Sequence, residues 1–366
     1  MYSMRTNWGM IVRSYINSIL MASRLIHQTV ASWNDHPRDL LHLINHFRDQ
    51  MPRPLVGLGH SMGGCQLYVE HQYSAHSSPA DRIQIDSTNL ALIHPRLLTS
   101  LVLLDPVIQQ QTLPAIGSGN LPAVASTFRR DLWPSRRAAA ESFRKSQFYQ
   151  AWDERVFDRW LQYGLRDVPT AIYPNDGATA DGEKPVTLTT TKHQEVFAFL
   201  RPTFGGKTNV ETTVIDRIAQ PDFDIAFPKW YPFYRPEPVR TFHNLPFVRP
   251  SVLYIFGGLS PMSPPEWRKE KMERTGSGIG GSGGVKEGRV KEVVLEEHGH
   301  LIALEAVGAC ADATAAWVGA EMKRCREEED RMMQGWSQMS RREKLVVSEE
   351  WKKTVVQGSP AMKGKL

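Results

Sequence analysis

A serine stands at the centre of the segment Gly59-His60-Ser61-Met62-Gly63, whose residue types and spacing suit nucleophilic catalysis. A serine hydroxyl is a weak nucleophile at neutral pH, so acyl transfer needs a base for its proton and donors for the developing oxyanion. Glycines at 59 and 63 allow a sharp strand-to-helix turn around Ser61, and the backbone N–H of Met62 is the expected oxyanion donor. A surface serine in a glycine-rich turn is the alternative. The apolar run before the segment and the helical pattern after it favour a nucleophile.

Two histidines follow the last predicted strand and compete for the role of base. They stand in Glu297-His298-Gly299-His300-Leu301, directly after the apolar run 293–295. After a nucleophile of this kind, the base comes last in chain order, on a loop that follows the final strand. We select His300, because a Gly-His pair that opens a helix is the usual form of that loop. His298 remains the alternative.

The carboxylate that orients the base has two candidate places, each after a predicted strand. Asp105 follows the run 101–104, where a carboxylate can hold the imidazole and stabilise its charged form. The later place, after residues 255–258, offers no carboxylate before Glu266. We therefore assign the acid to Asp105, with a capping role in its loop as the alternative.

Short apolar runs bounded by turn residues predict the strands that position these side chains. The runs 55–58 and 101–104 are apolar, which is typical of strands buried on both faces of a parallel sheet. Helical patterns lie between the runs, and parallel strands joined by helices imply right-handed crossovers. The predicted fold class is α/β, with a doubly wound, mostly parallel sheet. The predicted strands are 55–58, 101–104, 251–256 and 292–295.

The pattern of the chain changes between the second and third strands. Residues 112–248 carry helical patterns rich in Trp, Arg and Phe, which predict an inserted helical lid. Residues 68–88 are polar and aperiodic, which indicates an insertion after Ser61. The glycine-rich segment 276–284 lacks the ending of a phosphate-binding loop, so we expect a flexible surface loop. The expected organisation is an atypical N-terminal helix (1–32), a core (33–111 and 249–325), the lid (112–248) and a C-terminal tail (326–366).

Composition argues against several classes of function. The 366 residues, 41% of them hydrophobic, suffice for a full core, and the net charge of +5 is mild. The sequence shows no nucleic-acid-binding module, so no nucleic-acid partner is expected. Cysteines at 65, 310 and 325 suggest neither a disulfide framework nor a zinc site. The apolar stretch 10–26 is interrupted by Arg13 and Arg24, so no membrane span is expected.

Several segments together resemble fungal peroxisomal α/β-hydrolases of secondary metabolism. The resemblance is strongest to the type I acyl-CoA thioesterase of mycophenolic acid biosynthesis, with the host-selective toxin-biosynthesis hydrolases nearby. It implies the α/β-hydrolase fold, an acyl-CoA thioester with a lipophilic acyl part as substrate, and nucleophile, acid and base roles for Ser61, Asp105 and His300. The segments that carry it are 36–41, 59–67, 93–108 and the C-terminal tripeptide.

That tripeptide, Gly364-Lys365-Leu366, is similar to the Ser-Lys-Leu peroxisomal address. Within the resembled family it implies localisation in the peroxisome and an import receptor as a partner. If the tripeptide does not act as a peroxisomal address, the cytoplasm is the expected location.

One departure from the family lies on the N-terminal side of Ser61. In this fold several strands precede the nucleophile, and a loop between them carries a His-Gly-type segment that supplies the second oxyanion donor. Only 60 residues precede Ser61 here, and no such segment occurs among them. We therefore expect an N-terminally truncated sheet whose nucleophile strand lacks one neighbour. Loss of one oxyanion donor lowers turnover on the order of 100-fold to 1,000-fold.

The leading hypothesis is a serine hydrolase that cleaves acyl-CoA thioesters, with no cofactor and no metal. A carboxylic-ester hydrolase or lipase and a catalytically impaired remnant are the alternatives, because a Ser-His-Asp set alone does not distinguish the leaving group. Basic lid side chains are candidates for contact with the CoA phosphates, although a solvated surface role is favoured for each. They are Arg129, Arg130, Arg136 and Arg137.

Overall fold

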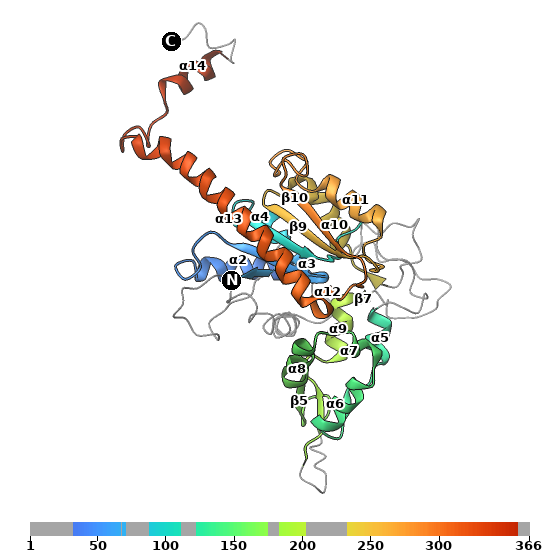
Figure 1. The fold of residues 1–366 in the computed structure, drawn as a ribbon. Helices are drawn as coiled ribbons and strands as arrows, with labels where there is room; N and C mark the ends of the chain where they lie inside the picture. The colour runs from blue at the N-terminus through green and yellow to red at the C-terminus, as the bar shows by residue number, and fades with distance from the viewer. Residues whose placement is uncertain are drawn as a thin grey trace, which may run out of the picture. The chain divides into compact units, whose positions relative to one another are not determined.

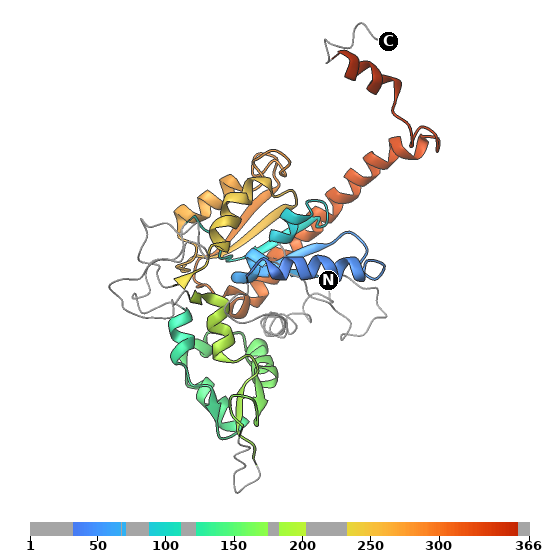
Figure 2. The ribbon, with the colours of Figure 1, turned by 180° about the vertical axis from the view of Figure 1, so that it is seen from behind.

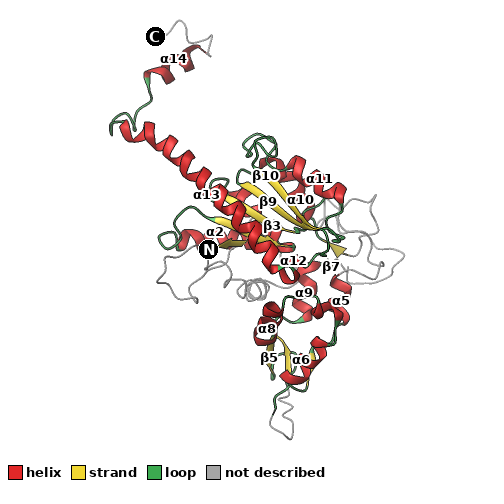
Figure 3. Ribbon diagram, in the orientation of Figure 1, coloured by secondary structure: helices red, strands yellow, loops and turns green. Residues whose placement is uncertain are grey.

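Within the described residues, the central sheet has four parallel strands and one antiparallel edge strand, in the order β10-β9-β3-β1-β2. A computed structural model describes residues 32–66, 68–70, 88–110, 122–174, 183–202 and 233–357. Helices separate the parallel strands along the chain, which confirms the predicted doubly wound, mostly parallel sheet (Figure 3). The strands are β1 (Val56–His60), β2 (Tyr68–Glu70), β3 (Ser100–Leu104), β9 (Ser251–Gly257) and β10 (Val290–Leu295).

The strand β2 pairs with the side of β1 on which the sequence predicts no neighbour. The register joins Val56 to Glu70 and Leu58 to Tyr68. The expectation of unpaired backbone groups on that side of β1 is therefore wrong for residues 56–58. Residues 68–70 begin the predicted insertion, whose residues 71–87 lie outside the described residues, as do residues 1–31 of the predicted N-terminal helix.

Helices cover both faces of the sheet. Since successive strand residues point to opposite faces, neighbouring residues of one strand pack against different helices. Leu101 and Tyr254 pack on one face with α2 (Asp35–His46), α4 (Thr88–Ile93) and α10 (Glu237–Asn244). Val102 and Ile255 pack on the other face with α12 (Ile302–Glu305) and the start of α13 (Val307–Gln338). Figure 1 shows the start of α13 on the near face of the sheet, and Figure 2 shows α2 on the opposite face.

Three more core elements lie next to these strands. They are α3 (Met62–Gln66), the 3-10 helix η4 (Leu245–Phe247) and α11 (Pro265–Arg274). Phe242, Leu245 and Val248, which fall within the predicted lid 112–248, belong to the core cluster around Leu101.

The glycine-rich segment 276–284 packs against residues 245–248. The N–H groups of Gly276 and Gly278 donate to the carbonyls of Leu245 (2.9 Å) and Pro246 (2.8 Å). Ser282 N–H donates to the carbonyl of Val248, also within reach at 3.1 Å. The segment is a loop with Ile279 exposed at the surface, as predicted, but its backbone bonds to the core contradict the expected flexibility.

The helices between β3 and α10 have an apolar cluster of their own. Trp133, Phe143 and Leu188 lie at its centre. Asp153 N–H donates to the Leu304 carbonyl of α12 at 2.8 Å, which joins this region to the core beside the loop of His300. The elements are α5 (Pro122–Phe128), β4 (Leu132–Trp133), α6 (Arg136–Arg144), α7 (Gln147–Gln150), α8 (Glu154–Tyr163), β5 (Leu165–Asp167), β6 (Val186–Leu188), α9 (Lys192–Phe199), β7 (Arg201–Pro202) and β8 (Phe233–Tyr234).

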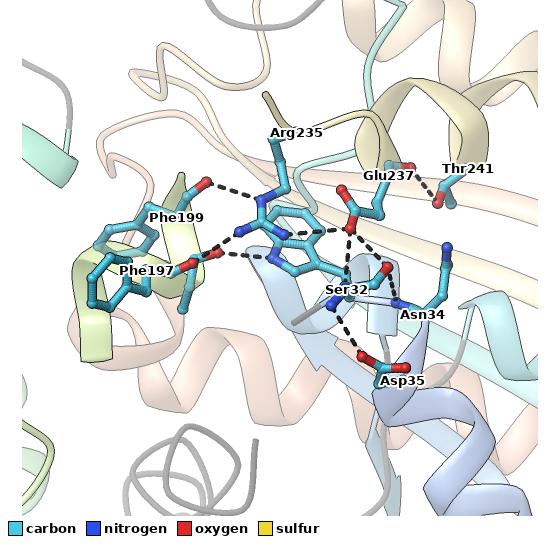
Figure 4. Close-up of polar contacts among 10 residues, drawn as sticks. Ser32, Asn34, Asp35, Phe197, Phe199, Arg235, Glu237 and Thr241 are labelled. Atoms are coloured by element: carbon cyan, nitrogen blue, oxygen red, sulfur yellow. Dashed lines mark hydrogen bonds and ion pairs between the residues drawn. The ribbon is translucent and has the colours of Figure 1, made fainter. Parts of the chain in front are cut away.

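A buried ion pair joins the segment before α2, the end of α9 and the start of α10 (Figure 4). Arg235 Nη1 lies 3.3 Å from Glu237 Oε1, and the two side chains are 6% and 1% exposed. The same carboxylate oxygen accepts the hydroxyl of Ser32 (2.8 Å) and the N–H of Trp33 (3.1 Å). Arg235 also donates to the Phe197 carbonyl at 2.8 Å. Three segments far apart in the sequence thereby share one hydrogen-bonded cluster.

The chain forms two units, Met1–Val318 and Gly319–Leu366. The sheet and the predicted lid belong to the first. The second contains the remainder of α13, which continues past the predicted boundary at residue 326, and α14 (Glu349–Gln357). Across the described part of the chain, every helix is too short or too polar to cross a bilayer.

Candidate active site

Ser61 lies at the junction between β1 and α3. Its φ of 56° is in the left-handed region, and its side chain is buried. Its N–H donates to the carbonyl of Leu104 at 3.0 Å, and its own carbonyl accepts the N–H of Val107 at 3.0 Å. These bonds hold the turn against the end of β3. Met62 is the first residue of α3, where backbone N–H groups have no acceptor within the helix.

Gly64 allows the loop after β3 to approach this turn. A Cβ built at Gly64 would lie 2.4 Å from the Cβ of Pro106 and 2.9 Å from its Cα. Those separations are too short for any side chain, so glycine is required where the two turns meet.

Asp105 is the first residue after β3 and is fully buried, with a φ of 41°. Its Oδ2 accepts the hydroxyl of Ser260 at 2.5 Å and lies 2.6 Å from His300 Nδ1. The N–H of Gly257 donates to Oδ1 at 3.4 Å. Burial acts to raise the pKa of the Asp105 carboxyl, but the hydrogen bond and charge of His300, together with the Ser260 hydroxyl, outweigh it and hold the pKa below its usual value.

His300 lies between Asp105 and Ser61. Its Nδ1 is 2.6 Å from Asp105 Oδ2, and its Nε2 is 2.6 Å from Ser61 Oγ. In the neutral ring, an Nδ1–H that donates to the carboxylate leaves Nε2 as acceptor for the serine hydroxyl. The competing His298 is 37% exposed, and its Nδ1 lies 3.9 Å from Glu305 Oε2. The structure therefore brings Ser61, Asp105 and His300 together, and leaves His298 at the rim of the loop.

The sequence alone predicts no role for two further side chains of the site, Ser260 and His60. Ser260 occupies the second place where a carboxylate was sought, and it donates to the carboxylate that stands at the first place. His60 Nε2 lies 2.8 Å from the carbonyl oxygen of His300. The position of Ser260 after β9, at the same edge of the sheet as Asp105, could have indicated a contact with that carboxylate. His60 adjoins the nucleophile, but one sequence does not reveal a partner 240 residues away.

Lys271 joins the loops that follow β3 and β9. It is fully buried, and its Nζ lies 3.3 Å from the carbonyl of Pro106 and 3.5 Å from that of Met262. The ammonium also lies 5.5 Å from the centroid of the Phe256 ring, a cation–π distance. Lys271 thus holds together the two loops that contribute Asp105 and Ser260.

The four lid arginines considered for phosphate binding each contact neighbouring groups of the lid. Arg129 pairs with Glu195 (3.1 Å), and Arg130 donates to the Leu132 carbonyl (2.8 Å). Arg136 donates to the Leu161 carbonyl (3.0 Å), and Arg137 pairs with Glu141 (3.5 Å). Among the described residues, no group of three or more His, Cys, Asp or Glu side chains is arranged to hold a metal ion.

A family model matches most of the chain. The model of the alpha/beta hydrolase family covers residues 24–313. The chain belongs to the alpha/beta hydrolase family. A solved structure agrees with the fold of this alpha/beta hydrolase: the peroxisomal alpha-beta-hydrolase Lpx1 from Saccharomyces cerevisiae has a TM-score of 0.50 at 14% identity, over 85% of this chain and 71% of that chain.

Fungal relatives match this alpha/beta hydrolase along most of its length, which confirms the resemblance seen in the sequence. The type I acyl-CoA thioesterase mpaH of Penicillium roqueforti is 40% identical over 347 residues, which are 91% of this chain and 73% of the relative. The abhydrolase domain-containing protein AFT2-1 of Alternaria alternata is 28% identical over 272 residues, 73% of this chain and 84% of the relative.

The tripeptide Gly364-Lys365-Leu366 lies outside the described residues. Its peroxisomal role therefore stays a prediction from the sequence.

Proposed function

We propose that this alpha/beta hydrolase cleaves an acyl-CoA thioester through Ser61, His300 and Asp105. The hydroxyl of Ser61 attacks the thioester carbonyl while His300 Nε2 takes its proton. Asp105 stabilises the imidazolium, and the Met62 N–H binds the oxyanion. The C–S bond then breaks, and His300 returns the proton to the CoA sulfur. Water then attacks the acyl-enzyme as His300 takes its proton, the bond between Ser61 Oγ and the acyl carbon breaks, and His300 returns the proton to Ser61 Oγ as the carboxylic acid leaves.

The observation that carries this proposal is the continuous hydrogen-bonded row of the three side chains. His300 Nε2 lies 2.6 Å from Ser61 Oγ, within reach for proton transfer, and Nδ1 lies 2.6 Å from Asp105 Oδ2, where the carboxylate orients the ring. The lowered pKa of Asp105 keeps the carboxylate ionised at neutral pH, as its proposed role demands. The thioester substrate is supported by the relatives at 40% to 42% identity, which are named type I acyl-CoA thioesterases.

The test uses the purified full chain and a fluorophosphonate probe, which labels only an activated serine. Labelling of the native chain and none of Ser61→Ala is the expected result. An unlabelled native chain would refute the hydrolase proposal and would favour an impaired remnant.

The thioester specificity has a separate test. Hydrolysis of acyl-CoAs is compared with that of alkyl esters of the same acids, with free CoA and free acid as the measured products. We expect the acyl-CoAs to have the higher kcat/KM. A preference for the alkyl esters would replace the thioesterase with the carboxylic-ester hydrolase.

The peroxisomal location forms a further part of the proposal. It rests on the similarity of Gly364-Lys365-Leu366 to a peroxisomal address, which an import receptor reads. A fluorescent fusion that keeps these residues at its C-terminus should enter peroxisomes. A fusion without them should stay in the cytosol, and equal distributions of the two would refute the assignment.

A further inference from the structure

His60 is the last residue of β1, directly before the proposed nucleophile, and its ring contacts the loop that carries His300. Its Nε2 lies 2.8 Å from the carbonyl oxygen of His300, and the two ring centroids are 5.2 Å apart. A carbonyl oxygen only accepts hydrogen bonds, so Nε2 of His60 carries the hydrogen and donates it. The contact joins the strand of Ser61 to the backbone of the proposed base.

We propose that His60 is a positioning residue, whose Nε2–H fixes the backbone of His300 so that its imidazole spans Ser61 and Asp105. This inference rests on the proposed function. Burial, with the nearby ring of His300, lowers the pKa of His60 to about 4. A neutral ring at physiological pH adds no positive charge beside the base.

The loop of His300 needs such a restraint because a backbone hydrogen bond holds it toward a different strand. Leu259 N–H donates to the His298 carbonyl at 3.0 Å, which holds the loop toward the segment after β9. Gly257 lies close beside it, since a Cβ there would be 2.0 Å from the Gly299 carbonyl oxygen. The bond from His60 holds the loop toward β1, from which Ser61 projects. A shift of about 1 Å between reacting groups can cost on the order of 100-fold in rate.

Two substitutions separate the hydrogen bond from the volume of the ring. His60→Phe keeps a flat ring and removes the donor, whereas His60→Gln places an amide N–H near the position of Nε2. For His60→Phe we expect kcat to fall on the order of 10-fold to 100-fold with KM unchanged. His60→Gln should recover most of that loss. His42→Phe, an exposed ring on α2, is the matched control and should have no effect.

A second measurement does not depend on turnover. The Nδ1–H of His300, bonded to Asp105, should give a downfield proton NMR resonance. We expect that resonance to broaden or disappear in His60→Phe and to persist in His60→Gln.

If Ser61→Ala abolishes labelling but His60→Phe leaves both kcat and the resonance as in the native chain, the positioning role is overturned and the proposed function stands. Equal losses in both His60 variants would also overturn it, because only one of them lacks the donor. If the native chain is not labelled at all, the proposed function fails, and the resonance alone decides the role of His60.

Discussion

The buried carboxylate of Glu237 offers a test of how the segment before α2 is held to the rest of the protein. Its Oε1 lies within reach of Arg235 Nη1 (3.3 Å), the Trp33 N–H (3.1 Å) and the Ser32 hydroxyl (2.8 Å). Glu237→Gln keeps the shape and one acceptor oxygen but removes the negative charge. Arg235, 6% exposed and 5.2 Å from the Trp33 ring centroid, would then stay buried while it loses the negative charge of Glu237.

The cost follows from the surroundings of the pair. Breaking a buried ion pair by neutralising one partner costs about 3–5 kcal/mol, because the remaining charge stays out of water. Two features act in opposite directions. Arg235 keeps its hydrogen bonds to the carbonyls of Phe197 (2.8 Å) and Phe199 (3.3 Å), which reduces the cost. Glu237 Oε2 is buried with no hydrogen-bond partner among the described residues, so an amide nitrogen there adds an unpaired donor. We expect a loss of about 3 kcal/mol from the free energy of unfolding.

Urea unfolding, followed by tryptophan fluorescence, measures this change in four proteins: the native chain, Glu237→Gln, Arg235→Met and the double variant. The double variant removes both charges, so we expect it to be more stable than Glu237→Gln alone, with a coupling of about 1–3 kcal/mol. Glu273→Gln breaks the exposed pair of Glu273 with Lys269 and is the matched control, expected to cost less than about 1 kcal/mol. If Glu237→Gln costs no more than this control, or the two single effects simply add, the explanation by a buried charge is refuted.

Three further predictions concern the site. Ser260→Ala removes a hydrogen bond to Asp105, so we expect the pKa of that carboxyl to rise and the acid limb of the pH–rate profile to move to higher pH. Gly64→Ala places a Cβ 2.4 Å from that of Pro106, and we expect kcat to fall by about 10-fold or more as the two turns separate. The folded-state pKa of His60, about 4, lies below its ordinary value of 6.5, so the unfolded chain binds the proton first as pH falls. Stability is therefore lost toward low pH, by about 2 kcal/mol between pH 7 and pH 5 relative to His60→Gln, measured by urea unfolding.

Each of these predictions has a contrary outcome. An unchanged acid limb in Ser260→Ala would show that the hydroxyl does not influence the carboxylate. Native kcat in Gly64→Ala would show that the turns tolerate separation. Parallel stability curves for the native chain and His60→Gln would show that His60 titrates alike in the folded and unfolded states.

The parallel strands β3 and β9 could be predicted because nearly all of their residues are apolar. The run 101–104 corresponds to β3 (Ser100–Leu104) and the run 251–256 to β9 (Ser251–Gly257). Both are buried along their whole length. Parallel order places the residues after β1 and β3 at one edge of the sheet, which is why Ser61 and Asp105 could be expected to meet.

Other features depend on contacts that no local pattern reveals. The antiparallel pairing of β2 joins three residues to β1 within a segment that is polar and aperiodic. Arg235 and Trp33 lie far apart in the sequence. An arginine alone is typical of the surface and a tryptophan of the core, so neither residue predicts their contact. The glycine-rich segment 276–284 has the composition of a flexible loop, but it also donates hydrogen bonds to carbonyls of residues 245–248. In each case a distant partner decides the structure, so periodicity and composition carry no information about it.

The backbone geometry predicts that the proposed base is the most sensitive part of this site. The register pairs His60 with Leu104, so Ser61 and Asp105 are the residues that follow a matched pair on neighbouring strands. Both have positive φ, at 56° and 41°, and strain of this kind costs on the order of 1–3 kcal/mol per residue. Hydrogen bonds to the neighbouring strands hold them there, from Ser61 N–H to the Leu104 carbonyl (3.0 Å) and from Asp105 N–H to the Ile255 carbonyl (2.7 Å). The sheet therefore fixes the hydroxyl and the carboxylate relative to each other. The imidazole of His300 comes from a loop instead, so its position depends on contacts such as the one with His60, and we expect activity to be lost there before the fold is.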